Sequence, residues 1–575
     1  MNKPTIIKTE RVDDIPLLLG QLERMGVQEL LDKHFATHGN WQGMSLGQIA
    51  IVWLSHILSQ ADHCLNHVQP WVEHRIESLR VLIGDDLRAL DMSDDRLESV
   101  LRYLSEDEPW KKFEQEVSQR QIQVYDLVPE RVRLDSTSVS GFWKEDEEGL
   151  FQYGQSKDHR PDLPQLKIMM ATLDPLGLPI ASEIVSGNSA DDPLYKPAIE
   201  RVRETLKRKG LLYVGDCKMG SLSTRYFIQS AGDYYLCPLS KTQVGIEEMK
   251  RYLSYIKEAK IELEDISYEY ANGKTIVIGK GYEQLYSCIL KQGEEEVIWE
   301  ERRLVVYSIG HAESQKKALQ SQIEKAKQDL ELLNQAKRGK KPFEDFQSFI
   351  EAAEKILDKN RVQSLFELDF KEEIEKVSQR KYGDRPAGII EKRQFQVKYA
   401  INPEQFEQQM EMLGWRVYAT NHSVKGLSLS EAVAVYRQEY LIEHCFGRLK
   451  GQPLSLRPMF LQREDHIKGL IRLLSIGLRL LTLVEFQVRR ALAISQSTLA
   501  QIYAGNPKRS TSRPTTERLL ACFKEITMVL ITVGEEMYVD VTSLNPLQQK
   551  ILQLLNFPMT IYTRLSSQSS DPPSK

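Results

Sequence analysis

The chain lacks both a disulfide framework and a candidate membrane span. Its six cysteines are scattered over 575 residues without a Cys-x-x-Cys pair, which is typical of a reducing compartment. The opening residues contain neither the apolar core nor the cleavage site of a secretory signal. The most apolar long run, residues 467–486, includes Lys468, Arg472, Arg479 and Glu485, which a bilayer interior disfavours. We therefore expect a cytoplasmic protein without a membrane partner.

The chain also lacks an overall excess of positive charge, since its net charge is −5. This average conceals an uneven distribution. Residues 436–518 contain fourteen Lys and Arg but six Asp and Glu, so this stretch carries +8 and the rest of the chain carries −13. A local concentration of positive charge is expected of a nucleic-acid-binding surface, although an ordinary solvated basic face has the same composition.

The length predicts three to four structural units, and the texture divides the chain into five segments. Apolar residues at three- and four-residue spacing predict a helical N-terminal domain. Short apolar strands with an amphipathic helix predict a mixed α/β core that is interrupted by an insertion of β-hairpins and a helical hairpin. A helical region with a disordered tail would close the chain. The expected ranges are 1–125 for the helical domain, 126–245 and 391–490 for the core, 246–390 for the insertion and 491–575 for the end.

Two patterns define the insertion. Asn272-Gly273 lies between alternating apolar residues, which predicts a β-hairpin. A heptad-like seam predicts the helical hairpin; it consists of Leu319, Ile323, Ala326, Leu330 and Leu333.

Two aspartates follow apolar, strand-like runs in the predicted core. "ERVRL" leads to Asp135, and "LLYVG" leads to Asp216. A single aspartate at a strand end is commonly a turn residue. Two of them in one sheet favour a ligand site, because open α/β sheets bind ligands at the carboxyl ends of their strands.

Glu443 is the third acidic candidate. Tyr436, Glu443 and Lys450 are seven residues apart, and seven residues turn a helix by about 700°, close to two full turns. They would share one helical stripe, although mixed charges on a helix also arise as weak surface ion pairs. Three converging carboxylates could hold two Mg²⁺ ions. One ion would activate the attacking oxygen and the other would stabilise the leaving oxygen of a phosphodiester.

These residues resemble the DDE transposases of bacterial insertion sequences, specifically the insertion-sequence-four superfamily. That group is marked by a Tyr-x2-Arg-x3-Glu-x6-Lys signature. Tyr436, Glu443 and Lys450 match it, whereas Glu439 stands at the Arg position. "RLDSTSVSG" and "YVGDCKMGS" resemble the segments that carry the first and second Asp. The resemblance covers about residues 20–490 and implies an RNase H-like catalytic core, a mixed sheet flanked by helices, with a β-rich insertion.

The resemblance implies an enzyme that cleaves double-stranded DNA at the terminal inverted repeats of its element and joins the 3′-OH to target DNA. Asp135, Asp216 and Glu443 would be the catalytic metal ligands for two Mg²⁺ ions, with Mn²⁺ as a substitute. Tyr436 and Lys450 would bind phosphates. The N-terminal helical domain, residues 1–125, would be the candidate for DNA-end binding. A homodimer on paired ends and a bacterial, nucleoid-associated location are further implications.

Other basic residues are candidates for DNA contacts. Arg437 would add a phosphate contact within the signature. Further backbone contacts are expected from Arg448, Lys468, Arg472 and Arg479. In the loop 156–162, Lys157, His159 and Arg160 would either contact DNA or brace Asp135, or would form an ordinary polar turn.

Two constellations have competing explanations. His63 and His67, with Cys64 between them, form an i, i+4 pair that could ligate zinc, but no second ligand pair is near in sequence, so a helix-surface or core role is favoured. Trp299 in the insertion could stack on an unpaired base or, as the favoured alternative, pack in the insertion's own core.

Two rival functions fit much of the same pattern. One is a decayed transposase that binds DNA as a regulator without catalysis, which the presence of all three carboxylates disfavours. The other is a host RNase H-like nuclease without strand transfer. Mg²⁺-dependent nicking of cognate ends would separate the first rival, and flanking inverted repeats would separate the second.

Overall fold

The computed structural model describes residues 5–145, 148–269, 273–293, 295–335, 343, 345–379, 388–534 and 536–566. The chain divides into two compact units. Unit 1 comprises Met1–Cys237, Leu290–Val297 and Val435–Lys575, and unit 2 comprises Pro238–Ile289 and Ile298–Ala434. Apart from residues 290–297, the predicted insertion falls within unit 2.

The central sheet is mixed and has nine strands. Five of them run in the order β4-β3-β2-β5-β6; their bounds are β2 Arg131–Ser140, β3 Gln165–Leu173, β4 Leu178–Ser186, β5 Leu212–Val214 and β6 Tyr234–Pro238. β2, β3 and β4 are antiparallel, whereas β2, β5 and β6 are parallel. The predicted mixed α/β core is therefore confirmed.

Helices flank these strands. α8 (Tyr195–Leu206) packs against β3 and β4, α7 (Asp107–Val124) packs against β4, and α15 (Tyr440–Lys450) packs against β2. α9 (Leu222–Ser230) connects β5 to β6. β3 is buried along its whole length, which explains why its sequence is a nearly continuous apolar run rather than an alternating one.

The most apolar run of the sequence lies in α16 (Glu464–Ile494). α16 packs against α3, α6, α15, α17, α18 and β4. Most of its turns are therefore buried within the protein, which explains its apolar composition. Among the described residues, no helix combines the length and the apolar character that crossing a membrane requires.

The N-terminal region is mainly helical, as predicted. Its helices are α1 Ile15–Arg24, α2 Val27–His34, α3 Leu46–Gln60, α4 Val68–Glu73, α5 Ile76–Ile83 and α6 Asp94–Leu104. The α3 helix begins with a capping box in which Ser45 and Gln48 bond each other's backbone N–H groups.

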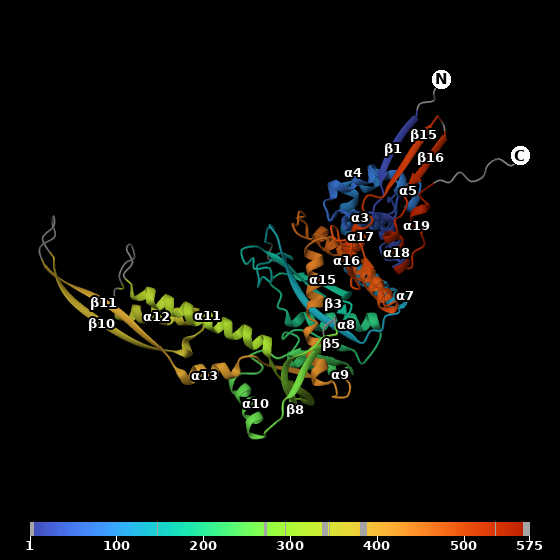
Figure 1. Cartoon of the computed structure of the whole chain (residues 1–575). Helices are drawn as coiled ribbons and strands as arrows, with labels where there is room; N and C mark the ends of the chain where they lie inside the picture. The colour runs from blue at the N-terminus through green and yellow to red at the C-terminus, as the bar shows by residue number, and fades with distance from the viewer. Residues whose placement is uncertain are drawn as a thin grey trace. The chain divides into compact units, whose positions relative to one another are not determined.

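The prediction that this region is entirely helical is wrong at its start. β1 (Thr5–Arg11) pairs antiparallel with β15 (Thr527–Val533), which pairs with β16 (Glu536–Val541). Figure 1 shows these three strands side by side, although they come from opposite ends of the chain. Such a pairing is decided by residues more than 500 positions apart, which local periodicity does not report.

The C-terminal region is likewise not only helical. Besides β15 and β16 it contains the short pair β13 (Leu499–Ala500) and β14 (Ser510–Thr511). Its helices are α17 Thr516–Ala521, α18 Pro546–Leu554 and α19 Thr560–Thr563. The predicted disordered tail from residue 567 onward lies outside the described residues.

Unit 2 contributes the remaining strands of the central sheet, in the order β12-β9-β8-β7. These are β7 Glu264–Glu269, β8 Thr275–Gln292, β9 Glu295–Ser308 and β12 Trp415–Thr420. β7 and β8 are antiparallel, as the predicted hairpin requires. Gly273 has a φ of 78°, a conformation that glycine adopts without strain, while Asn272 lies outside the described residues. α10 (Ile246–Glu258) precedes β7.

The predicted helical hairpin of the insertion is α11 (Ile309–Asn334) and α12 (Phe346–Lys359). Its seam forms the core of this part of unit 2, where Leu319, Ile323, Ala326 and Leu330 are buried with Phe349, Ala353 and Leu357. The β10–β11 hairpin, which was not predicted as such, runs alongside both helices (Figure 1); its strands are Phe366–Gln379 and Gly388–Ile401. α13 (Pro403–Met412) follows.

Candidate active site

Asp135 and Asp216 occupy matching positions on neighbouring parallel strands. β2 pairs with β5 as far as Arg133 and Val214, and β5 ends there. Two further residues along each chain lead to Asp135 and Asp216. Burial raises the pKa of Asp135, and the charge of Asp216 raises it further, so the two carboxylates interact. The site lies at the carboxyl end of a parallel pair, where open α/β sheets bind ligands.

Asp135 does not end its strand, contrary to the prediction. It is the fifth of ten residues of β2, and the strand continues because β3 pairs with it as far as Ser140. On the β5 side of β2, no strand lies opposite Asp135, because the shorter strand β5 has already ended. A sequence reading of one strand does not reveal that its two neighbours differ in length.

The helical segment 435–450 crosses the face of β2 that carries Asp135. Residues 133, 135 and 137 share one face of a strand. The Arg133 guanidinium donates to the Val435 carbonyl (2.7 Å) at one end of this segment. The Lys450 ammonium donates to Thr137 Oγ1 (2.6 Å) at the other end. The segment is therefore anchored on both sides of Asp135.

These anchors place Glu443 on a segment that crosses the Asp135 face of β2. Glu443 lies midway along the helical segment, just as Asp135 lies midway between the two anchored positions of β2. The Glu443 side chain is exposed, whereas Asp135 and Asp216 are half-buried. Glu439, one turn before Glu443 on the same segment, is close enough to both aspartates for their charges to act on it.

The signature segment is not a single helix. α14 (Leu429–Arg437) ends before Gln438, and α15 begins at Tyr440. At the junction the N–H groups of Gln438 and Glu439 donate to carbonyls three residues back, which winds this turn more tightly than an α-helix. Glu443 and Lys450 keep their common stripe within α15. Contrary to the prediction, Tyr436 is not joined to that stripe by continuous α-helix.

Glu439, at the signature's Arg position, lies close to the same site. Its carbonyl accepts the Glu443 N–H (3.3 Å), so the two acidic residues are one helical turn apart. Burial raises the pKa of Glu439, and the charges of Asp135 and Glu443 raise it further, with a smaller effect from Asp216. Four carboxylates therefore share this region, and an added cation would relieve their repulsion.

Two side chains contact the aspartates. The Tyr195 hydroxyl donates to Asp216 Oδ1 (2.6 Å). Burial and the charge of Asp216 raise the pKa of Tyr195 well above its usual value, so the phenol keeps its proton and remains a donor. The Lys157 ammonium lies 3.4 Å from Asp135 Oδ1 and donates to the Ser136 carbonyl (2.6 Å). Sequence reasoning missed Tyr195, for which no motif gave a signal.

Lys450 forms an ion pair with an acidic residue of the loop 156–162. Its ammonium lies 2.8 Å from Asp158 Oδ1, and Arg457 binds the second Asp158 oxygen. Burial and the nearby charge of Lys157 nevertheless lower the pKa of Lys450 to about 8. A carboxylate thus holds two cations where a DNA phosphate would be expected.

The remaining loop candidates point to different roles. Lys157 braces Asp135, which is one of the two functions considered for it. His159 and Arg160 are exposed, and Arg160 forms an ion pair with Asp162 (2.7 Å).

Arg437 is exposed at the end of α14, whereas Tyr436 is buried with 8% of its surface exposed.

Four of the predicted phosphate contacts instead bind carboxylates of the protein. Arg472 and Arg479 are 6% and 1% exposed, and they pair with Asp107 and Glu114. The other two pairs are Arg448 with Glu485 (2.5 Å) and Glu517 (2.8 Å), and Lys468 with Asp107 (2.6 Å). Buried guanidinium groups require such partners.

Trp299 also differs from its base-stacking prediction. It lies in β9 and is 6% exposed, so its ring belongs to the interior of the insertion. This is the alternative that the sequence favoured.

Comparison with known proteins identifies the class. The profile of the transposase DDE domain family matches residues 128–480, which is more than half of the chain. The chain therefore belongs to this family, whose members are transposase enzymes. No curated protein matches. Among solved structures, the piggyBac transposase synaptic complex with hairpin DNA is similar at a TM-score of 0.24 and 11% identity, over 45% of this chain and 59% of that one.

The donor set of the site fits the cations that this family uses. DDE transposases typically use divalent metal ions. The site offers carboxylate oxygens from Asp135, Asp216 and Glu443, and hard divalent cations prefer oxygen ligands. The charges of Asp135, Asp216 and Glu443 all act on Glu439, and a bound cation would relieve repulsion among such carboxylates.

Proposed function

We propose that this transposase acts on a bacterial insertion sequence of the insertion-sequence-four superfamily. It would bind the terminal inverted repeats, cut the DNA at the element's ends and join the freed 3′-OH to target DNA, as a homodimer on paired ends. The observation that carries this proposal is that Asp135 and Asp216 follow the β2–β5 pairing while the helical segment with Glu443 crosses the Asp135 face of β2.

Asp135, Asp216 and Glu443 are the residues that would hold the ions, which we propose to be Mg²⁺. Two such ions, when bound, would supply Lewis-acid stabilisation of the attacking and leaving oxygens. The protein's own part is to hold the carboxylates in place. The Tyr195 hydroxyl orients Asp216 through its hydrogen bond, and the Lys157 ammonium stabilises the negative charge of Asp135.

Lys450 is the phosphate contact that the geometry supports best. It is the last residue of α15 and lies beside β2, two residues beyond Asp135 along the strand face. A DNA phosphate would compete with Asp158 for its ammonium. Arg437, His159 and Arg160 are exposed and remain candidates for further backbone contacts. Arg448, Arg472 and Arg479 are left out because they are buried and pair with carboxylates of the protein, and Lys468 is left out because it pairs with Asp107.

The test compares cleavage and binding in one variant. Asp135→Asn removes a carboxylate charge without changing size, so cleavage of element-end DNA in Mg²⁺ should be lost while binding persists. Asp540→Asn, at an exposed position on β16, is the matched control and should cleave normally. Full cleavage by the Asp135→Asn protein would refute the assignment.

The same assay separates the rival functions. A wild-type protein that binds ends but never nicks them in Mg²⁺ would be a regulator without catalysis. A protein that nicks DNA of any sequence but never joins a 3′-OH to target DNA would be a nuclease.

A further inference from the structure

A second group of metal-ligand side chains lies in the N-terminal helical region. Asp62, Cys64 and His67 each offer one ligand atom, and these three atoms lie within 4.8 Å of one another. They belong to the connection between α3 and α4, which ends in a single 3-10 turn at Leu65–His67. None of them takes part in the candidate active site.

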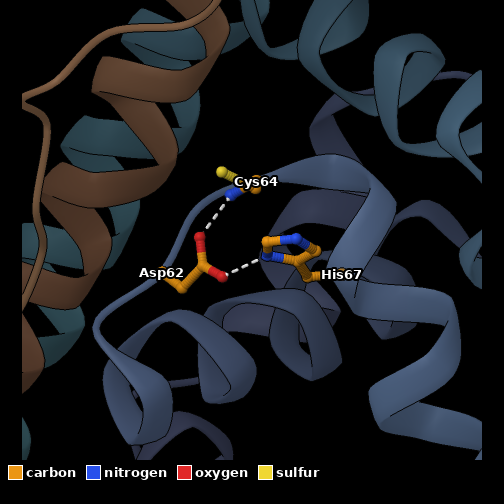
Figure 2. A group of neighbouring side chains, drawn as sticks. All are labelled: Asp62, Cys64 and His67. Carbon is orange, nitrogen blue, oxygen red and sulfur yellow. Dashed lines mark hydrogen bonds and ion pairs between the residues drawn. The ribbon is translucent and has the colours of Figure 1, made fainter.

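Asp62 organises this group. Its Oδ1 accepts the Cys64 N–H (2.9 Å), and its Oδ2 lies 2.6 Å from His67 Nδ1. Figure 2 shows the Asp62 carboxylate between the Cys64 backbone and the His67 ring. Three residues that are close in sequence are thus held together by one turn before any ion binds.

The ligand set differs from the one that the sequence suggested. His63 of the predicted His63–His67 pair is 2% exposed, and its ring lies 5.8 Å from that of Phe460. Asp62 takes its place beside His67. A mixed set of sulfur, imidazole nitrogen and carboxylate oxygen suits Zn²⁺, whereas Mg²⁺ prefers oxygen alone.

A buried histidine beside the group provides an independent observation. His56 of α3 is 2% exposed, and its Nδ1 makes no hydrogen bond within the described part of the chain. Buried polar atoms are rarely left without a partner. The charges of Asp62 and His67 both act on the His56 ring, so this histidine lies near the group.

We propose that Asp62, Cys64 and His67 form a Zn²⁺ site. The ion ties the end of α3 to the start of α4 and stabilises the N-terminal helical region. The site is distinct from the Mg²⁺ site of the proposed function in both position and ligand chemistry.

The proposal predicts one tightly bound zinc ion per full-length chain. The protein is stripped with a chelator, reloaded with ZnCl₂, dialysed and measured by metal analysis. A parallel titration with CoCl₂ should produce the near-ultraviolet absorption of a thiolate–cobalt bond. Cys64→Ser should abolish this absorption and weaken zinc binding by more than about tenfold, and saturating zinc should raise the melting temperature of the wild type but not of this variant.

Controls separate this site from the catalytic one. Cys522→Ser changes another half-buried cysteine and should keep the cobalt absorption. Cys217→Ser tests the thiol next to Asp216 and should also keep it. His67→Gln, at an exposed ligand, should reproduce the loss in a protein whose far-ultraviolet circular dichroism is unchanged. Absence of thiolate–cobalt absorption in the wild type, or its persistence in Cys64→Ser, overturns the proposal without affecting the proposed function.

Discussion

The basic residues of α15 and α16 belong to one positively charged stretch but have different surroundings. Lys450 ends α15 beside the carboxylate site, where it touches Thr137 and Asp158. Arg472 and Arg479 of α16 are in the interior and bind Asp107 and Glu114 of α7. Both sets are paired with carboxylates of the protein, so a surplus of positive charge in the sequence does not by itself mark a DNA-binding surface.

The pairing of α16 with α7 follows from matched spacing. Arg472 and Arg479 are seven residues apart, and so are Asp107 and Glu114. Seven residues are close to two helical turns, so each helix presents its two charges on one side. The common face of the two arginines was predicted correctly, but that face meets α7.

The largest expected effect is on catalysis. Glu443→Gln should lower the rate of end cleavage by about 10³-fold or more, because a lost metal ligand forfeits several kcal/mol of transition-state stabilisation. Glu443 is exposed, so the melting temperature should hardly change. Rates are measured with saturating end DNA in Mg²⁺.

Glu204→Gln is the matched control for this variant, since Glu204 is also an exposed residue near the end of a helix. It should retain wild-type rate and stability. Equal rates for the two variants would remove α15 from the catalytic site.

The second effect is on stability and concerns α16. Arg479→Met leaves Glu114 with one cation fewer in the interior, and breaking a buried ion pair costs about 3 kcal/mol. Cleavage per folded molecule should be unchanged. Urea unfolding followed by circular dichroism measures the loss.

Arg463→Met gives the surface counterpart, because Arg463 pairs with Asp465 while 63% of its side chain is exposed. That change should cost much less stability than Arg479→Met, because solvent screens an exposed ion pair. If the two variants lost the same stability, the contrast between buried and exposed cations would fail.

The third effect is on DNA binding. Lys450→Gln should reduce the slope of log affinity against log salt by about 0.9, the contribution of one phosphate contact. Lys468→Gln should leave that slope unchanged, because Lys468 binds Asp107 (2.6 Å). Fluorescence anisotropy with end DNA over a salt series makes the measurement, and the reverse pattern would exchange the roles of the two lysines.

The smallest effect is a pH dependence at Lys450. A lysine with a pKa of about 8 is charged at pH 7 and loses its charge as the pH rises through 8. End-DNA affinity should fall by about fivefold between pH 7 and pH 9, equivalent to about 1 kcal/mol.

Lys450→Arg keeps its charge throughout this range, so its affinity should stay level. A wild-type affinity that is also level would show that Lys450 keeps its proton through its bond to Asp158.

Much of the fold and site could be predicted from local pattern. The heptad-like seam of α11 lies in a buried core because helical periodicity alone decides which side chains share a face. Asp135 and Asp216 were identified because both follow apolar strands, although β2 continues beyond Asp135. What local pattern could not supply was the length of the neighbouring strands, or Tyr195, which reaches Asp216 from another helix.

The sequence by itself determined the elements and the spacing of the candidate residues, because periodicity and residue type act within a few turns of the chain. Only the tertiary structure decided which charges face solvent and which face each other. It paired β1 with β15, turned Arg472 and Arg479 toward α7, and placed Glu439 beside three other carboxylates. These outcomes depend on burial and on partners distant in sequence, and the free energy of a charge is set by both.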